Sequence, residues 1–373
     1  NKSYREHTII HTDPASVRIE ADSAVQEAGW DGDYYVDADH INIDSVDLFI
    51  ETSDFFTLDV ADYTGMPANK ADTEQFIAKY LPLCGTITVP GIEKPLEITE
   101  NKIRHAAECY LLAVQKAGEI YRKIEAKKGA GNFITEVSMD ETDIPQTPEE
   151  LLFILAAISD EGIPAQTIAP KFTGRFNKGV DYIGNLEKFE EEFNEDICII
   201  SYAVEHFNLP ENLKLSIHSG SDKFSIYPIM GKAIRKYEAG LHVKTAGTTW
   251  LEEIIGLAES GSEGTALAKE IYRASHSRYD ELTGPYAAVI DIDKQQLPTP
   301  DEFDQWTGKM ITDAVRHDLT NPAYNLHMRQ LLHVGYKVAA EMGPRYSDAL
   351  IKHQDIIGEN VTINLWERHI KRI

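Results

Sequence analysis

The chain has 373 residues, with 36 basic against 61 acidic side chains and a formal net charge of −25. Hydrophobic residues make up 42% of it, enough for the core of one large α/β domain or of two average ones, which argues against a disordered chain. Binding to nucleic acid or to an anionic membrane needs clustered Lys and Arg, so the acidity predicts neither as a partner.

Cysteine content and hydropathy exclude further classes. Three cysteines without a CxxC pair argue against a disulfide framework and against a zinc site built from four cysteines. No apolar run approaches the roughly 18 residues of a membrane span, and the first residues are polar, so we expect neither a span nor a signal peptide. These features predict a cytoplasmic globular protein, and a homo-oligomer is compatible with all of them.

Short β-rich runs, each ending in polar residues, recur along the chain with helical patterns between most of them. Thr147-Pro148-Glu149-Glu150 and Thr299-Pro300-Asp301-Glu302 each combine an N-cap, a first-turn proline and a glutamate at the third helical position. Strands that alternate with helices indicate crossover connections and a parallel sheet. The predicted strands, in chain order, are 34–40, 55–62, 133–140, 165–171, 213–218, 241–245 and, more weakly, 287–291.

Polar side chains share one face of several predicted strands. Lys214, Ser216 and His218, for example, alternate with Leu215 and Ile217. A doubly wound sheet buries both faces in apolar residues, whereas a barrel tolerates polar inward residues near its C-terminal rim, where its chemistry lies. We therefore predict an α/β fold, a (β/α)8 TIM-type barrel.

One stretch interrupts the alternation between the early strands. Residues 63–131 contain a probable hairpin, 85–89 with 95–98, and a long helix over 100–127. We predict a large insertion near the barrel mouth, a common position for a lid. The predicted organisation is residues 1–62 as the N-terminal part of the barrel, 63–131 as the insertion, and 132–373 as the remainder of the barrel with C-terminal helices.

Several cofactor and nucleophile motifs are absent from the sequence. No GxGxxG follows a strand to cradle a nicotinamide cofactor, and there is neither a GxxxxGK[ST] phosphate loop nor a GxSxG nucleophile elbow. The remaining chemistry is that of carboxylates, imidazoles, lysines and a bound metal.

Histidines near the ends of three different predicted strands are the strongest constellation. His40, His218 and His242 can converge across a barrel mouth and leave an open position for substrate, as in catalytic sites for Zn²⁺, Mn²⁺, Ni²⁺ or Co²⁺. We predict these three as ligands of a divalent cation. His276 or Glu141 could replace one of them.

Other ionisable residues lie at the same predicted strand ends. Carboxylates at a metal-lined mouth can divide proton donation from proton abstraction, and basic residues in so acidic a protein indicate a receptor for a small anion such as a carboxylate. The predicted catalytic residues are Asp39, Glu136 and Asp140. The predicted substrate-binding residues are Lys171, Arg175, Ser219, Lys223 and Lys244.

Lys244 also supports a different chemistry. The run Val243-Lys244-Thr245-Ala246-Gly247 is similar to the Lys-Thr-Ser-Thr-Gly stretch of Schiff-base aldolases of the deoxyribose-phosphate type. A buried strand lysine with a lowered pKa could form an imine with a keto sugar. An aldolase or sugar isomerase that uses Lys244 is therefore an alternative.

Three segments resemble the tagaturonate/fructuronate epimerases of hexuronate catabolism. They are the run from Ser216 to Pro228, the run from His242 to Trp250, and Asp37-Ala38-Asp39-His40. The resemblance implies a metal-dependent barrel enzyme that inverts C4 of a keto-uronate, with D-tagaturonate and D-fructuronate as substrates.

The C4 hydrogen of such a substrate is not acidic, because it is two carbons from the C2 ketone. Retro-aldol cleavage and re-formation of the C3–C4 bond is therefore the predicted mechanism. A metal-dependent hydrolase or isomerase with other substrates, and a non-catalytic sugar-acid binding protein, remain alternatives.

Overall fold

The computed structural model describes residues 2–142, 144–245 and 247–373, and for residue 248 it describes the backbone alone. They form two compact units. Unit 1 comprises Asn1–Thr173, Glu187–His218 and Ala233–Val243. Unit 2 comprises Gly174–Leu186, Ser219–Lys232 and Lys244–Ile373.

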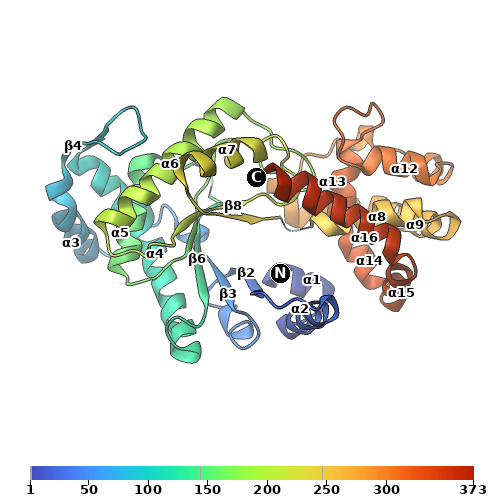
Figure 1. The fold of residues 1–373 in the computed structure, drawn as a ribbon, viewed down its shortest axis with the longest axis horizontal. Coiled ribbons are helices and arrows are strands. Elements are labelled where there is room, and N and C mark those ends of the chain that lie inside the picture. The colour runs from blue at the N-terminus through green and yellow to red at the C-terminus, as the bar shows by residue number, and fades with distance from the viewer. Residues whose placement is uncertain (1, 143, 246) are drawn as a thin grey trace. The chain divides into compact units, whose positions relative to one another are not determined.

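Unit 1 is built on a seven-stranded sheet in the order β1-β2-β3-β6-β7-β8-β9 (Figure 1). Each neighbouring pair from β1 to β8 is parallel, which confirms the predicted parallel α/β architecture. The strands are β1 (Lys2–Ser3), β2 (Asp37–Ile41), β3 (Phe55–Asp59), β6 (Ile134–Ser138), β7 (Thr167–Ala169), β8 (Lys214–His218) and β9 (Leu241–Lys244).

Six of the seven predicted strands are confirmed, and one is wrong. Residues Gly284–Val289 form a 3₁₀ helix that covers most of the predicted run 287–291. Pro285 stands in the first turn of that helix, where a ring without an N–H favours a helical start over a strand ladder. Among the described residues the sheet therefore has seven strands and is open, with β1 and β9 at its two ends, rather than a closed barrel of eight.

The helices of unit 1 follow the sequence signals closely. The capping box of Thr147 and Glu150 starts α5, and helix α4 runs close to its predicted bounds. The two helices pack against each other, and α4 also contacts β3 through a side lined by alanine and aliphatic side chains. The helices are α1 (Tyr4–Ile10), α2 (Pro14–Ala28), α3 (Lys70–Tyr80), α4 (Glu100–Lys128), α5 (Pro148–Asp160) and α6 (Leu186–His206), with short 3₁₀ turns at Val46–Leu48, Ala61–Tyr63 and Leu81–Leu83.

Between β3 and β6 the chain makes α3, the antiparallel hairpin β4 (Gly85–Ile87) and β5 (Leu96–Ile98), and α4. The predicted hairpin and long helix are thus present. In the hairpin loop Gly91 has φ +94°, and a Cβ there would lie 2.6 Å from Sγ of Cys198 in α6. The loop therefore packs tightly against that helix, and a role of this segment as a lid stays a prediction.

Unit 2 is mainly helical (Figure 1). The second of the two predicted capping boxes, Thr299 with Glu302, lies in this unit and starts α11 as expected. Helix α7 (Tyr227–Tyr237) begins in unit 2 and ends in unit 1. The others are α8 (Thr248–Glu259), α9 (Ser262–Ser277), α10 (Tyr279–Thr283), α11 (Pro300–Asp304), α12 (Gly308–Val315), α13 (Leu326–Val334), α14 (Tyr336–Glu341), α15 (Pro344–Lys352), α16 (Gln354–Thr362), a π-helix (Ile363–His369) and 3₁₀ turns at Lys294–Gln296 and Ile370–Arg372.

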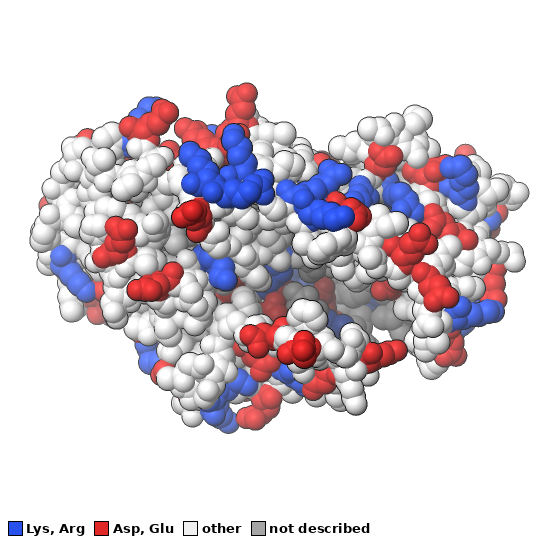
Figure 2. All heavy atoms as spheres, in the orientation of Figure 1, with Lys and Arg blue, Asp and Glu red and all other residues white. Residues whose placement is uncertain are grey.

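The surface mixes both signs of charge despite the large net negative charge. On the face in Figure 2, basic side chains gather in places between scattered acidic ones. No helix in the described parts of the chain is long and apolar enough to span a bilayer.

Candidate active site

Three potential metal ligands meet at the carboxyl ends of strands in unit 1. His40 lies in β2, His218 ends β8, and Asp140 follows β6 by two residues. One nitrogen of each imidazole and one oxygen of Asp140 all lie within 4.8 Å of one another. Nδ1 of His218 is 3.1 Å from Oδ2 of Asp140, and the two imidazole centroids are 5.0 Å apart. We call these three residues the strand-end triad.

The backbone of β2 is irregular where it supplies the triad. Its register against β3 shifts between Ala38 and Ile41, and His40 has φ +49°. A histidine in the left-handed region is strained, and such strain is found mainly at functional sites. In a regular strand Asp39 and His40 would point to opposite faces. Here Oδ1 of Asp39 lies 3.8 Å from Nε2 of His40.

The triad stands in a strongly acidic environment. Nδ1 of His40 lies 3.2 Å from Oδ2 of Asp59, the last residue of β3. Burial alone would lower the pKa of His40, but Asp39, Asp59 and Asp140 outweigh it and raise this pKa to about 9. Burial opposes ionisation of Asp140, yet His218 and His40 hold its pKa well below the usual range. These carboxylates favour a cation between them.

The donor set fits a divalent cation. Imidazole and carboxylate together suit Zn²⁺, Mn²⁺, Ni²⁺ and Co²⁺. With metal–ligand bonds of about 2.0 Å, two donors on one tetrahedral ion lie about 3.3 Å apart. The separation of 3.1 Å between His218 Nδ1 and Asp140 Oδ2 is close to that value.

The carboxylate of Glu136 lies between two imidazoles. Its side chain, on β6, is fully buried, with Oε1 2.7 Å from Nε2 of His218 and Oε2 3.0 Å from Nδ1 of His242. Thr57 and Thr167 donate hydrogen bonds to the same two oxygens, over 3.1 and 2.8 Å. The predicted catalytic residue Glu136 is thus enclosed by protein donors.

Of the three predicted histidine ligands, two are in the triad. The third, His242, is not part of it: its Nδ1 lies 3.0 Å from Oε2 of Glu136 and 2.9 Å from Oγ of Ser216. Its side chain is 29% exposed, against 6% for His218. Of the proposed replacements, Glu141 is exposed and lies 3.9 Å from Arg5, and His276 lies in α9 of unit 2.

Comparisons with known proteins agree on one family. The model of the UxaE family, described as tagaturonate epimerase, matches residues 1–357. The chain belongs to the tagaturonate epimerase family. A tagaturonate/fructuronate epimerase of Thermotoga maritima is 28% identical, and the match covers 100% of this chain and 73% of that protein.

Solved structures show the same fold. Crystal structures of the fructuronate-tagaturonate epimerase UxaE from Cohnella laeviribosi superpose with TM-scores of 0.81 for a glycerol complex and 0.79 for the native form. Their sequence identities to this chain are 22% and 21%, and each match covers 100% of this chain and 74% of the other.

The predicted substrate-binding residues of this tagaturonate epimerase family member are divided between the units. Lys171 follows β7 in unit 1 and is half-buried. Among the residues that the structure describes, no carboxylate forms an ion pair with its ammonium. Arg175, Ser219, Lys223 and Lys244 belong to unit 2. Arg175 is exposed and pairs with Asp291 at 3.2 Å.

The other three of these residues are buried. Ser219 donates its hydroxyl to the carbonyl of Lys244 at 2.9 Å. Lys223 is fully buried and donates from Nζ to the carbonyl of Asn177 at 2.9 Å. Burial lowers the pKa of Lys223 to about 7. The hydrogen bond from Lys223 to Asn177 ties two segments of unit 2 together, a role that the sequence did not indicate.

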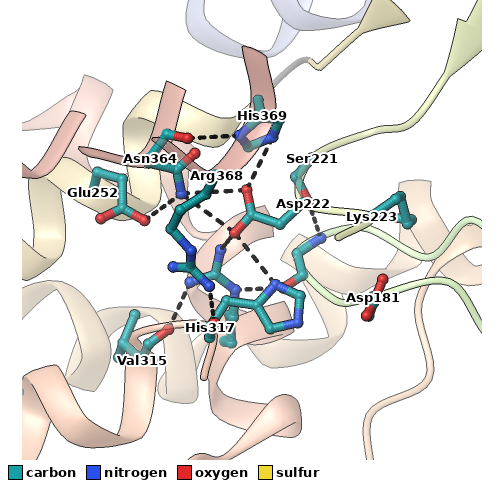
Figure 3. Close-up of polar contacts among 12 residues, drawn as sticks. Asp181, Ser221, Asp222, Lys223, Glu252, Val315, His317, Asn364, Arg368 and His369 are labelled. Carbon is teal, nitrogen blue, oxygen red and sulfur yellow. Dashed lines mark hydrogen bonds and ion pairs between the residues drawn. The ribbon is translucent and has the colours of Figure 1, made fainter. Parts of the chain in front are cut away.

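Asp222, inside the longest segment of family resemblance, is the centre of a buried network in unit 2 (Figure 3). Oδ2 accepts a hydrogen bond of 2.5 Å from Arg329, which is fully buried as well. Burial opposes ionisation, but Arg329 and the nearby histidines hold the pKa of Asp222 well below its usual range. The other side chains around it are His317, Asn364 and His369.

Sequence reasoning did not select several of these residues. Asp59 ends β3 and could have been found by the same strand-end rule that selected Asp140. His317, Arg329 and His369 are remote in sequence from Asp222, so no local pattern links them to it. Asp222 was part of the resemblance but carried no assigned role.

Proposed function

We propose that this chain is a divalent-metal-dependent epimerase that interconverts D-tagaturonate and D-fructuronate by inversion at C4. The observation that carries the proposal is the strand-end triad of His40, Asp140 and His218 in a member of the tagaturonate epimerase family. In the proposal these three residues hold Zn²⁺, Mn²⁺, Ni²⁺ or Co²⁺. The bound ion would supply Lewis-acid stabilisation of negative charge on substrate oxygens.

Inversion at C4 proceeds by cleavage of the C3–C4 bond. The carboxylate of Asp39 takes the proton of the C4 hydroxyl. The electron pair of that O–H bond becomes the second bond of an aldehyde at C4, and the C3–C4 pair moves to C3 and the C2 oxygen as an enediolate. The aldehyde fragment turns its other face, C3 attacks it, and O4 recovers the proton.

Asp39 suits the role of base better than the other predicted acids. Glu136 is enclosed by four donors, and Asp140 belongs to the triad. Asp39 adjoins the triad through His40, at 3.8 Å. In this proposal Lys171 binds the substrate carboxylate. Lys171 follows β7, and the end of β7 lies beside the end of β6, because the amide of Met139 donates a hydrogen bond to the carbonyl of Ala169.

A turnover assay with labelled substrate tests the proposal. Purified protein is incubated with tagaturonate deuterated at C4, before and after chelation, and fructuronate is followed by chromatography. The account predicts metal-dependent conversion with full retention of deuterium, because C4 never loses its hydrogen. Label loss to water would discard carbon–carbon cleavage, and absence of turnover under all metals would favour a binding protein.

Borohydride separates the imine alternative from the metal mechanism. Reduction in the presence of substrate traps an imine as a secondary amine, which adds the substrate mass to Lys244. We expect no adduct and no loss of activity. An adduct on Lys244 would move the electron sink from the metal to the lysine.

A further inference from the structure

We infer that Glu136, held by Thr57 and Thr167, is a positioning residue that fixes His218 so that Nδ1, and not Nε2, serves as its metal-binding nitrogen. The inference rests on the proposed metal site and adds three residues that do not bind the metal but hold one of its ligands in place. It removes Glu136 from the group that touches substrate.

The contacts of Glu136 account for both of its oxygens. Oε1 receives Thr57 at 3.1 Å and faces Nε2 of His218 at 2.7 Å. Oε2 receives Thr167 at 2.8 Å and faces Nδ1 of His242 at 3.0 Å. An ionised carboxylate only accepts hydrogen bonds, so Nε2 of His218 carries the hydrogen in this contact.

The tautomer of His218 decides which nitrogen is left for a metal. When a cation is bound, hydrogen on Nε2 leaves the lone pair on Nδ1, which lies 3.1 Å from Oδ2 of Asp140 inside the triad. Carboxylates that hold the second nitrogen of a ligating histidine commonly fix its ring and increase its basicity. Glu136 has the position of such a carboxylate.

Burial explains why the threonines are needed. Glu136 is fully buried, as are Thr57 and Thr167, and an isolated buried carboxylate is strongly unfavourable. The register puts Thr57 opposite Glu136 on β3 and Thr167 opposite it on β7, so one hydroxyl reaches the carboxylate from each neighbouring strand. Valine, which is enriched in strands, would remove the donor to Oε1 at position 57 and the donor to Oε2 at position 167.

Isosteric variants separate the hydroxyl from its packing. Thr57→Val and Thr167→Val keep shape and remove the donor, whereas Thr57→Ser and Thr167→Ser restore it. Thr135→Val is the matched control, because Thr135 is buried on β6 beside Glu136 and no hydrogen-bond partner of its Oγ1 is found in the described ranges. Glu136→Gln removes the charge itself.

The readout is Zn²⁺ affinity, measured by chelator competition without substrate. We expect a loss of about 10- to 100-fold for Glu136→Gln and a several-fold loss for each Thr→Val variant. Serine should restore affinity, and Thr135→Val should leave it unchanged. Equal affinity in the Val variants and wild type, or equal loss in the Val and Ser variants, would overturn the inference. If the variants change Zn²⁺ affinity as expected but the wild-type protein does not turn over keto-uronates, the result would count against the proposed function alone.

Discussion

Nδ1 of His218 and Oδ2 of Asp140 lie 3.1 Å apart, although the two residues are 78 positions apart in the sequence. His218 ends β8 and Asp140 follows β6, with β7 between those strands in the sheet. Parallel strands bring their carboxyl ends to one edge, so two residues selected by strand-end position meet there. These two atoms are two of the three ligand atoms of the proposed metal centre.

Asp140→Asn should abolish tight metal binding with little effect on folding. The amide is a weaker ligand and cannot offset the charge of the cation. Metal content after dialysis, measured by mass spectrometry, and circular dichroism check the two parts. The exposed neighbour Glu141, as Glu141→Gln, should keep its metal. Wild-type metal content in Asp140→Asn would remove Asp140 from the ligand set.

The contribution of His40 to the stability of the metal-stripped protein should be lost as the pH rises from about 6.5 to 9. The pKa of His40 is higher in the folded chain, about 9, than its ordinary 6.5, so the folded state binds the extra proton between these values. Stability from this group is fully present below pH 6.5 and is lost as the pH rises through 9, by about 3 kcal/mol at most.

Urea unfolding of wild type and His40→Gln at both pH values, with chelator present, isolates this contribution. Lys223, whose pKa of about 7 is below its ordinary value, acts in the opposite direction and is common to both proteins. The difference between the two proteins should therefore shrink or reverse at pH 9. An identical pH dependence in both would show that His40 is not the group responsible.

Lys171→Met should raise KM for the keto-uronate by about 10- to 100-fold, because a hydrogen bond between charged partners contributes about 1.5–3 kcal/mol. Metal content should not change. Lys188→Met, an exposed lysine of unit 1 paired with Glu191, is the control and should behave as wild type. An unchanged KM in Lys171→Met would exclude this residue as the carboxylate receptor.

Asp222→Asn should destabilise unit 2 by about 3–5 kcal/mol, because Arg329 would remain buried without its counter-charge. Urea unfolding with hydrogen exchange localises the loss to unit 2. The surface pair of Lys309 and Asp313 offers the control, and Asp313→Asn should cost no more than about 0.5 kcal/mol. A small change in Asp222→Asn would contradict the role of this network in stability.

Much of the fold could be predicted because its signals are local. Capping boxes at Thr147 and Thr299 fixed two helix starts, and polar strand ends marked six strands. β1, only two residues long, has no periodicity to detect. The run 287–291 has strand-like composition, but the preceding Pro285 favours a 3₁₀ helix.

The candidate site could be predicted only in part, because two of its features depend on the assembled sheet. The irregularity in β2 turns His40 toward the side of Asp39, which alternation along a strand does not allow. Which of His242 and Asp140 lies with the other two ligands depends on how the strand ends are arranged in the folded sheet, where Nδ1 of His242 faces Glu136 at 3.0 Å. No sequence spacing encodes that choice.

Metal titration of the stripped protein tests the central claim most directly. Zn²⁺, Mn²⁺, Ni²⁺ or Co²⁺ is added in steps while bound metal and tagaturonate-to-fructuronate conversion are measured on the same samples. The account predicts that activity rises in proportion to bound metal, saturates at one ion per chain, and does not appear in Asp140→Asn or His218→Gln at the same metal concentrations. Full turnover by the metal-free wild-type chain would contradict it.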